Sequence, residues 1–507
     1  MIWIATTPAS AIFLQRDTAN QDYVALAWVR GCWEFFTEKM LAVYFLAPLF
    51  RLFGPSPRWE QVWLAVLAAV SAALVYLLTK LVSRSRFAGV LAVGLLLSLP
   101  AFQFFNRTYF GYLFPFLLLG WLAAYYQRWL WTGLFFGLAI LGHFNSLVPV
   151  GLSTILLFVY FLRHVPVRQW FFYAAGGLAP LIITEGLFFF YMGHVHAFVW
   201  LRGTIDVIRS PLVESLLQPG WLWVAAAIAM MNGWILAGTL LFGALAAPLV
   251  LRRDRYGLAL GLSFAGVVLF YTLQAGLSSL VVVPRLLMSA LPFWCIAAGI
   301  LIAKAVASLP AQGLRTIASV SAVGLVVIGA ASTGAFIRQF TQTLIPKIDQ
   351  AFQQAAAEAR PVRMVGHPQV ALFYSQLYGV ELLVNDTLWI ESWMPDQAVL
   401  IFEGEGPTNL TSNNYDVRRF SLRAEQDRQY PALTEEAGLG RAMEVWWPIN
   451  ESKSVNPGRP TDIAKASYYY AGAGCFTPPV YSDGDRPRSL HYYQLAWKKV
   501  LAVFGQA

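Results

Sequence analysis

The chain carries a long series of apolar segments, most of which approach the roughly 20 residues that an α-helix needs to cross a bilayer. Hydrophobic residues make up 58% of the 507 residues and charged residues only 12%, a balance that excludes a soluble globular protein. We therefore predict a polytopic α-helical membrane protein with about 11 transmembrane helices. The predicted helices cover 2–14, 60–82, 87–104, 110–126, 130–143, 147–162, 170–191, 221–250, 257–279, 284–305 and 316–336.

The basic residues between these segments predict the orientation of the chain. One set of alternate connections is rich in Lys and Arg, with Asp254 almost its only acid, and the cytoplasmic loops of membrane proteins are enriched in Lys and Arg. We therefore expect the basic connections to be cytoplasmic and the other set to face outward, in an integral protein of the plasma or inner membrane. The net charge of +9 then indicates membrane lipids as partners and not nucleic acid. The basic connections hold Lys80, Arg84, Arg86, Arg128, Arg163, Arg168, Arg252, Arg253, Arg255, Lys304 and Arg315.

The C-terminal third has a different composition. From about residue 338 charges, Asn, Pro and Gly become frequent, and no apolar run approaches membrane length. Residues 362–366, 380–385 and 398–403 are predicted strands, and 368–379 a helix. The sequence thus predicts two domains: a membrane domain, 1–337, with its first outward loop at 15–58, and an extracytoplasmic soluble α/β domain, 338–507.

The stretch 16–39, RDTANQDYVALAWVRGCWEFFTEK, concentrates charge where charge is otherwise scarce. It contains Asp17, Asp22, Glu34, Glu38 and Lys39, within the first outward loop. A carboxylate held near a leaving group can act as general base for an acceptor hydroxyl or amine. The alternative is a solvated loop whose acids have no chemical role.

Short motifs in a fixed order give this stretch a wider context. Asp17, Ala19, Ala25 and Gly31 fit a D-E-A-x-Y-x-x-x-A-x-x-x-x-x-G pattern. Further motifs follow in the chain: Glu38-Lys39, Leu52-Phe53-Gly54, Asn106-Arg107-Thr108-Tyr109, the run GLFFGLAILGHFNSLVPVGL, and Pro284-Arg285-Leu286-Leu287 with Pro292. Their order resembles the GT-C superfamily of membrane glycosyltransferases, in particular the branch of protein O-mannosyltransferases and lipid A aminoarabinose transferases. The resemblance covers residues 1–337.

This resemblance implies an enzyme that transfers a sugar from a polyprenyl-phosphate-linked donor to an acceptor on the extracytoplasmic face. The acceptor would be a lipid, a glycan or a protein. Asp17 would be the catalytic base, and Asp22 would replace it if the register is shifted. The donor phosphate would be bound by cations on the outward side, for which the candidates are Lys39, Arg107, His143 and Arg285.

Departures from the family pattern keep alternatives open. Thr18, Gln21 and Met40 replace the usual Glu, Tyr and Pro, and residues 110–112 include no Asp where many members carry one. These changes leave the need for a divalent metal open, and the sequence indicates no cofactor with certainty. They also keep open a catalytically silent GT-C-like subunit or scaffold. A lipid or sugar transporter is a further alternative, although the sequence shows no internal repeat.

Four more residues are candidates for the site. Glu38 precedes Lys39, and Glu185 lies inside an apolar segment, where an acid is costly enough to suggest a function or a helix–helix hydrogen bond. His194 and His196 lie in the outward loop 192–220, where a His-x-His pair could bind a metal if a third ligand were near.

Overall fold

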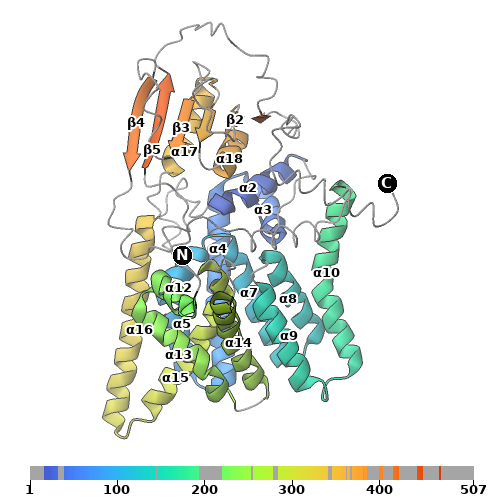
Figure 1. Ribbon diagram of the computed structural model, residues 1–507, viewed down its shortest axis with the longest axis vertical. Coiled ribbons are helices and arrows are strands. Elements are labelled where there is room, and N and C mark those ends of the chain that lie inside the picture. The colour runs from blue at the N-terminus through green and yellow to red at the C-terminus, as the bar shows by residue number, and fades with distance from the viewer. Residues whose placement is uncertain are drawn as a thin grey trace.

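The computed structural model describes 16–31, 39–143, 146–192, 220–252, 255–277, 284–340, 345–360, 362–365, 368–380, 382–384, 399–403, 415–421, 442–448 and 467–469. The predicted helix 2–14 lies outside these ranges. Within them, a bundle of helices makes up the larger part, and a mixed sheet with its helices lies beyond one end of the bundle (Figure 1).

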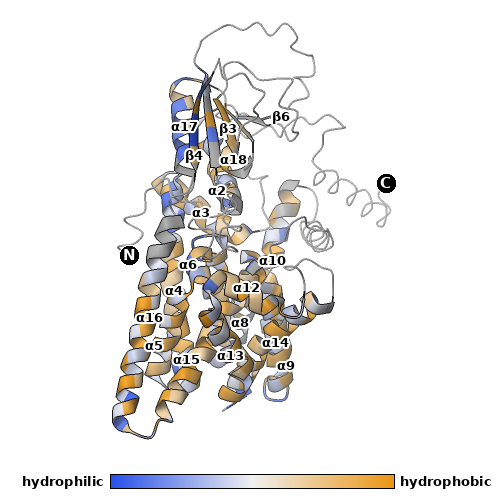
Figure 2. Ribbon diagram, turned by 60° about the vertical axis from the view of Figure 1, so that its left-hand side comes forward, coloured by the Kyte–Doolittle hydropathy of each residue, from blue (hydrophilic) through white to orange (hydrophobic). Residues whose placement is uncertain are grey.

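Apolar helices build the bundle, as the hydropathy colouring of Figure 2 shows. The described residues include five helices long and apolar enough to cross a membrane, and several shorter apolar helices accompany them. The helices of the bundle are α4 (Pro57–Ser83), α5 (Arg86–Ser98), α6 (Pro100–Phe105), η1 (Tyr109–Tyr112), α7 (Leu113–Tyr125), α8 (Trp129–Gly142), α9 (Leu147–Phe161), α10 (Val167–Met192), α12 (Trp223–Asn232), α13 (Trp234–Val250), α14 (Arg255–Leu277), η3 (Pro284–Ala290), α15 (Leu291–Ala307) and α16 (Gln312–Phe340).

Most of these helices lie where the apolar runs predicted them, but the run 221–250 forms two helices. α12 ends at Asn232, and α13 begins at Trp234. Gly233 between them has φ +81°, a left-handed conformation that interrupts an α-helix and that glycine adopts without a steric cost. The apolar periodicity continues through this position, which is why it predicted one span.

Burial separates the centre of the bundle from its edges. The span that ends in α15 is 83% buried, whereas those of α10 and α16 are 11% and 6% buried. α10 and α16 stand at opposite edges of the bundle in Figure 1. Because both expose apolar residues along most of their length, they are well suited to face lipid.

The C-terminal part contains a six-stranded sheet in the order β4-β5-β3-β1-β2-β6. β1 pairs in parallel with β2 and β3, and the other neighbours pair antiparallel. The sequence predicted β1, α18, β2 and β3 to within a few residues, but not β4 to β6. The elements are α17 (Ile345–Ala357), β1 (Val362–Val365), α18 (Pro368–Tyr378), β2 (Leu382–Val384), β3 (Val399–Glu403), β4 (Tyr415–Ser421), β5 (Ala442–Pro448) and β6 (Ser467–Tyr469).

Two helices from the predicted outward loop 15–58 join the bundle to the sheet. They are α2 (Arg16–Val29) and α3 (Met40–Phe53) (Figure 1). α2 is helical because Ala19, Tyr23 and Leu26 recur at helical spacing, and all three are buried. One apolar cluster continues from α2 and α3 into the sheet domain, where it includes Phe352 and Phe373. The loop 15–58 therefore contains ordered structure that holds the two parts together.

Candidate active site

Asp22 is the acid of the charged stretch whose side chain the structure describes. It lies in the middle of α2, has no solvent exposure, and lies beside the carboxyl group of Glu60. Neither carboxyl has a hydrogen-bond partner among the described residues. Because two negative charges buried side by side repel each other, the pair favours keeping a proton.

The pKa of Asp22 reflects this environment. Burial raises it well above the usual range of an aspartate, and the neighbouring Glu60 carboxyl offsets part of that effect. A raised pKa means that the carboxyl holds its proton more tightly than a free aspartate, and general acid–base catalysis uses groups shifted in this way. The two carboxyls are therefore a candidate acid–base pair.

Glu60 was not singled out by the sequence, although it begins the predicted helix 60–82. It lies in the first turn of α4, which starts at Pro57 with Ser56 as N-cap, and its side chain is fully buried. The backbone N–H groups of a helix N-terminus favour negative charge there. An acid near the end of a membrane span is costly, and that signal could have identified Glu60 as a candidate.

Tyr112 lies next to this pair. The charges of Glu60 and Asp22 both act on it, and its buried hydroxyl makes no hydrogen bond with any other described residue. Tyr112 belongs to the segment 110–112, where the family pattern often has an Asp. In this chain the Glu60 carboxyl of α4 lies near Tyr112.

A second cluster gathers three of the predicted cations. Lys39 Nζ lies 4.0 Å from the centre of the Tyr109 ring, and that ring stacks on His143 with 5.1 Å between centres. The positive charges of Lys39 and Arg285 both act on His143. Lys39 and His143 are buried, whereas Arg285 is half-buried at the start of η3.

The short helix η1 joins the acid pair to the cation cluster. Tyr109 contacts Lys39 and His143, and Tyr112 faces Asp22 and Glu60. Residues three apart in a 3₁₀-helix lie on the same side, with an axial separation of about 6 Å. Carboxyl groups and cationic groups are thus presented side by side.

The structure places the remaining predicted residues as follows. Arg107 is buried in the turn before η1, where its carbonyl oxygen accepts a hydrogen bond from Gln61 Nε2 at 3.1 Å. Glu185 is half-buried in α10, and its charge acts on Tyr44 of α3.

Asp17 lies in the first turn of α2, but its side chain lies outside the described part. Glu38, His194 and His196 lie outside the described residues altogether.

No group of three His, Cys, Asp or Glu side chains comes together within the described ranges. The Asp22–Glu60 pair supplies two carboxyl groups and no third ligand of these types there. A zinc site generally takes at least three protein ligands, whereas Mg²⁺ is usually bound through one or two carboxylates together with substrate phosphates. The described residues therefore contain no ligand set of the zinc type.

The sheet domain reaches the acid pair through α18. Arg30, directly after α2, donates from Nη2 to the Gln376 carbonyl oxygen at 2.7 Å. Tyr374 is buried near Asp22, whose charge acts on it, and Gln376 is fully buried with no hydrogen bond from its side chain to other described groups. The sheet domain thus closes one side of the site.

Comparisons with known proteins place this arrangement in a structural context. No protein-family model and no curated protein sequence matches the chain. Two crystal structures of ArnT from Cupriavidus metallidurans do match its fold. The apo structure shows 12% sequence identity and a TM-score of 0.51, covering 88% of this chain and 95% of that one. The structure of ArnT bound to undecaprenyl phosphate shows 14% identity and a TM-score of 0.52, with 88% and 97% covered. The chain therefore has the GT-C fold, in an α-helical membrane protein with a C-terminal sheet, as the sequence resemblance predicted.

Proposed function

We propose that this protein is a membrane glycosyltransferase that transfers a sugar from a polyprenyl-phosphate-linked donor to an acceptor hydroxyl or amine. The observation that carries the proposal is the meeting of the Asp22–Glu60 pair and the Lys39–His143–Arg285 cluster on η1. Transfer of this kind needs a proton acceptor and a phosphate-binding site close together. The ArnT structure bound to undecaprenyl phosphate supports the choice of a polyprenyl carrier.

The reaction assigns a separate task to each cluster. The ionised carboxyl of the Asp22–Glu60 pair accepts the proton of the acceptor as the acceptor oxygen or nitrogen attacks the anomeric carbon. The bond between that carbon and the phosphate oxygen breaks, and its electrons remain on the polyprenyl phosphate. Lys39 and Arg285 stabilise the negative charge that the leaving phosphate gains. Sugar and acceptor enter as substrates, and the acceptor class stays open between lipid, glycan and protein.

Of the two candidate bases, Asp22 has more support than Asp17. The resemblance implied Asp17, but Asp22 is the residue with a described carboxyl partner and with a raised pKa. A base needs to hold its charge in a place that excludes water and admits the acceptor. We therefore propose Asp22 as the base, with Glu60 as the group that shares its proton.

The orientation belongs to the same proposal. We place the Asp22 site and the sheet domain, residues 338–507, on the extracytoplasmic face, because the basic connections lie at the opposite end of the bundle. A reporter that is active only outside the cytoplasm, fused to the C-terminus, should give a signal. A correctly inserted but silent fusion would refute this topology.

The central experiment separates binding from transfer. The purified chain in lipid nanodiscs is titrated with undecaprenyl phosphate and then incubated with a panel of undecaprenyl-phosphate sugars together with lipid, glycan and peptide acceptors, with release of the free carrier as readout. We expect the wild type to bind the carrier and Asp22→Asn to bind it without releasing it from any sugar donor. If the wild type binds undecaprenyl phosphate but releases no carrier from any sugar donor, the result favours the catalytically silent subunit. If the wild type does not bind undecaprenyl phosphate, the result contradicts both the enzyme and a carrier-binding subunit.

A further inference from the structure

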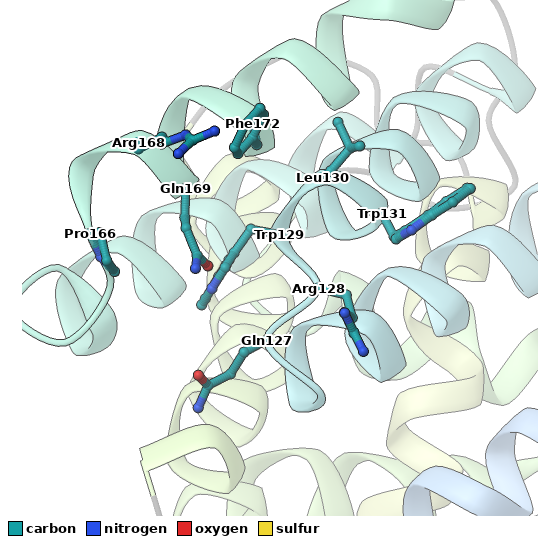
Figure 3. Close-up of a pocket in the computed structure, with 9 residues that line it drawn as sticks. All are labelled: Gln127, Arg128, Trp129, Leu130, Trp131, Pro166, Arg168, Gln169 and Phe172. Atoms are coloured by element: carbon teal, nitrogen blue, oxygen red, sulfur yellow. The ribbon is translucent and has the colours of Figure 1, made fainter.

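An open groove lies at the end of the bundle opposite the sheet, far from the acid pair. It has a volume of about 610 Å³, in the size range of ligand sites, and lies between the α7–α8 turn and the start of α10 (Figure 3). Two arginines and no acidic residue line it. Its lining residues are Gln127, Arg128, Trp129, Leu130, Trp131, Pro166, Arg168, Gln169 and Phe172.

The polar groups of the groove are held by defined backbone structure. The N–H groups of Gln127 and Arg128 donate to the carbonyls of Ala124 and Ala123, and Gln127 has φ +54°, which together form the Schellman motif that ends α7. This turn fixes the position from which Arg128 and Trp129 extend. On the other side, the guanidinium of Arg168 lies over the Phe172 ring at 5.3 Å.

Trp129 provides an independent sign of a ligand. Its side chain is 2% exposed and packs against Trp170 with 4.9 Å between ring centres. Its indole N–H is buried and has no acceptor among the described residues. Because a buried donor without an acceptor is unfavourable, a groove ligand that supplies an oxygen would satisfy it.

The surroundings of the groove indicate a lipid. Directly above it α8 and α10 touch through glycines: a Cβ on Gly176 would lie 2.2 Å from the Leu130 carbonyl oxygen, and one on Gly133 would lie 1.9 Å from that of Tyr173. The groove is therefore closed toward the middle of the bundle. Toward the outside, α10 exposes Phe171, Leu178 and Ile182, an apolar face along which acyl chains can lie.

We propose that this groove binds the headgroup of an anionic phospholipid, whose phosphate oxygens accept hydrogen bonds from Arg128, Arg168 and the Trp129 indole. Arginine binds phosphate through two parallel N–H groups, and tryptophan is favoured at the membrane interface. The ligand belongs to the leaflet on the side of the basic connections. This inference is independent of the glycosyltransferase proposal.

Native mass spectrometry of the delipidated full chain in detergent tests it. Titration with phosphatidylglycerol should reveal one lipid bound at least about tenfold more tightly than phosphatidylcholine, since an anionic headgroup pairs with both arginines. The double variant Arg128→Gln/Arg168→Gln should lose this preference. The matched control Arg84→Gln/Arg86→Gln, which removes two arginines from the α4–α5 turn, should keep it.

A finer pair of variants tests the indole. Trp129→Phe removes the N–H and keeps most of the ring, and should weaken phosphatidylglycerol several-fold, whereas Trp131→Phe, whose ring is 52% exposed, should not. Melting temperatures are followed in parallel, and if Trp129→Phe unfolds, the arginine variants decide alone. Equal loss in the arginine control, or equal binding of the two lipids, would overturn the proposal. Competition by free glycerol phosphate would overturn the choice of a lipid.

Discussion

The two ends of the bundle differ in how deeply their charged side chains are buried. At the end that meets the sheet domain, Asp22, Glu60, Lys39 and His143 are at most 5% exposed. At the other end, Arg84, Arg86, Arg128, Arg168, Arg252 and Arg255 are half-buried or exposed. Burial of a charged group costs several kcal/mol, whereas an exposed arginine at a membrane surface costs little. The buried charges therefore belong to the proposed active site, and the exposed charges support the proposed orientation and the proposed lipid site.

The largest effect is expected at the acid pair. Asp22→Asn keeps the size of the side chain but removes the proton acceptor, so sugar transfer should fall by about 10² to 10⁴-fold. Undecaprenyl phosphate binding should persist, because the cation cluster is unchanged. Release of the carrier from undecaprenyl-phosphate sugars measures the first effect, and titration measures the second.

Two controls make this result specific. Asp416→Asn removes an exposed carboxylate of the sheet domain, which pairs with Arg418, and should leave transfer unchanged. Asp17→Asn tests the base that the family resemblance implied. If transfer is lost at Asp17 and kept at Asp22, the assignment of the base to Asp22 is wrong.

A smaller effect is expected at the cation cluster. Lys39→Gln removes a buried charge and should weaken undecaprenyl phosphate binding by about tenfold or more, and Arg285→Lys, which loses the bidentate geometry, by several-fold. Lys347→Gln, a change on α17 of the sheet domain, is the control. Unchanged binding in both site variants would show that the carrier phosphate binds elsewhere.

The sequence predicted the cation cluster more completely than the acid pair, and the reason is physical. Lys39, His143 and Arg285 each belong to a motif or a helix end that can be recognised locally. The Asp22–Glu60 pair is a contact between α2 and α4, which no local spacing indicates. Tyr374 and Gln376 are even farther from Asp22 in sequence, and only the packing of α18 on α2 brings them to the site.

The fold shows the same division. Long apolar runs predicted most bundle helices, since a membrane span needs length and hydropathy alone. Gly233, by contrast, divides one run into two helices through a single backbone angle. The strands β4 and β5 lie in a polar, less regular part of the chain. Short strands depend on partners distant in sequence, which explains why periodicity missed them.

The pH dependence of stability provides a still smaller effect. Asp22 has a raised pKa in the folded protein and an ordinary one, near 3.9, when unfolded. Between these values the folded state binds more protons, so the stabilising contribution is complete below the unfolded pKa and is lost as pH rises through the folded pKa. We expect the melting temperature to fall as pH rises from the unfolded pKa through the folded pKa.

Asp22→Asn identifies the source of that change. The variant cannot release the proton, so its melting temperature should depend less on pH than that of the wild type across the same interval. The wild-type and variant curves should approach each other toward low pH. Parallel curves would mean that Asp22 titrates alike in the folded and unfolded states, against the shared-proton arrangement.

The smallest effect is expected at the opposite end of the bundle. Arg84 and Arg86 flank the turn between α4 and α5, where Arg84 is the C-cap of α4 and Ser85 is the N-cap of α5. Neither arginine has a described ion-pair partner among the salt bridges of the chain, and substitutions at such surface positions usually change stability by less than about 0.5 kcal/mol. The variant Arg84→Gln/Arg86→Gln should therefore keep the wild-type melting temperature, transfer activity and carrier binding. Because Gln has no ring or branch at Cβ, it replaces Arg84 without adding strain to the left-handed conformation at φ +59°. A loss of stability comparable with that of a site variant would show that charge at this end also supports the fold, and the contrast between the two ends would no longer hold.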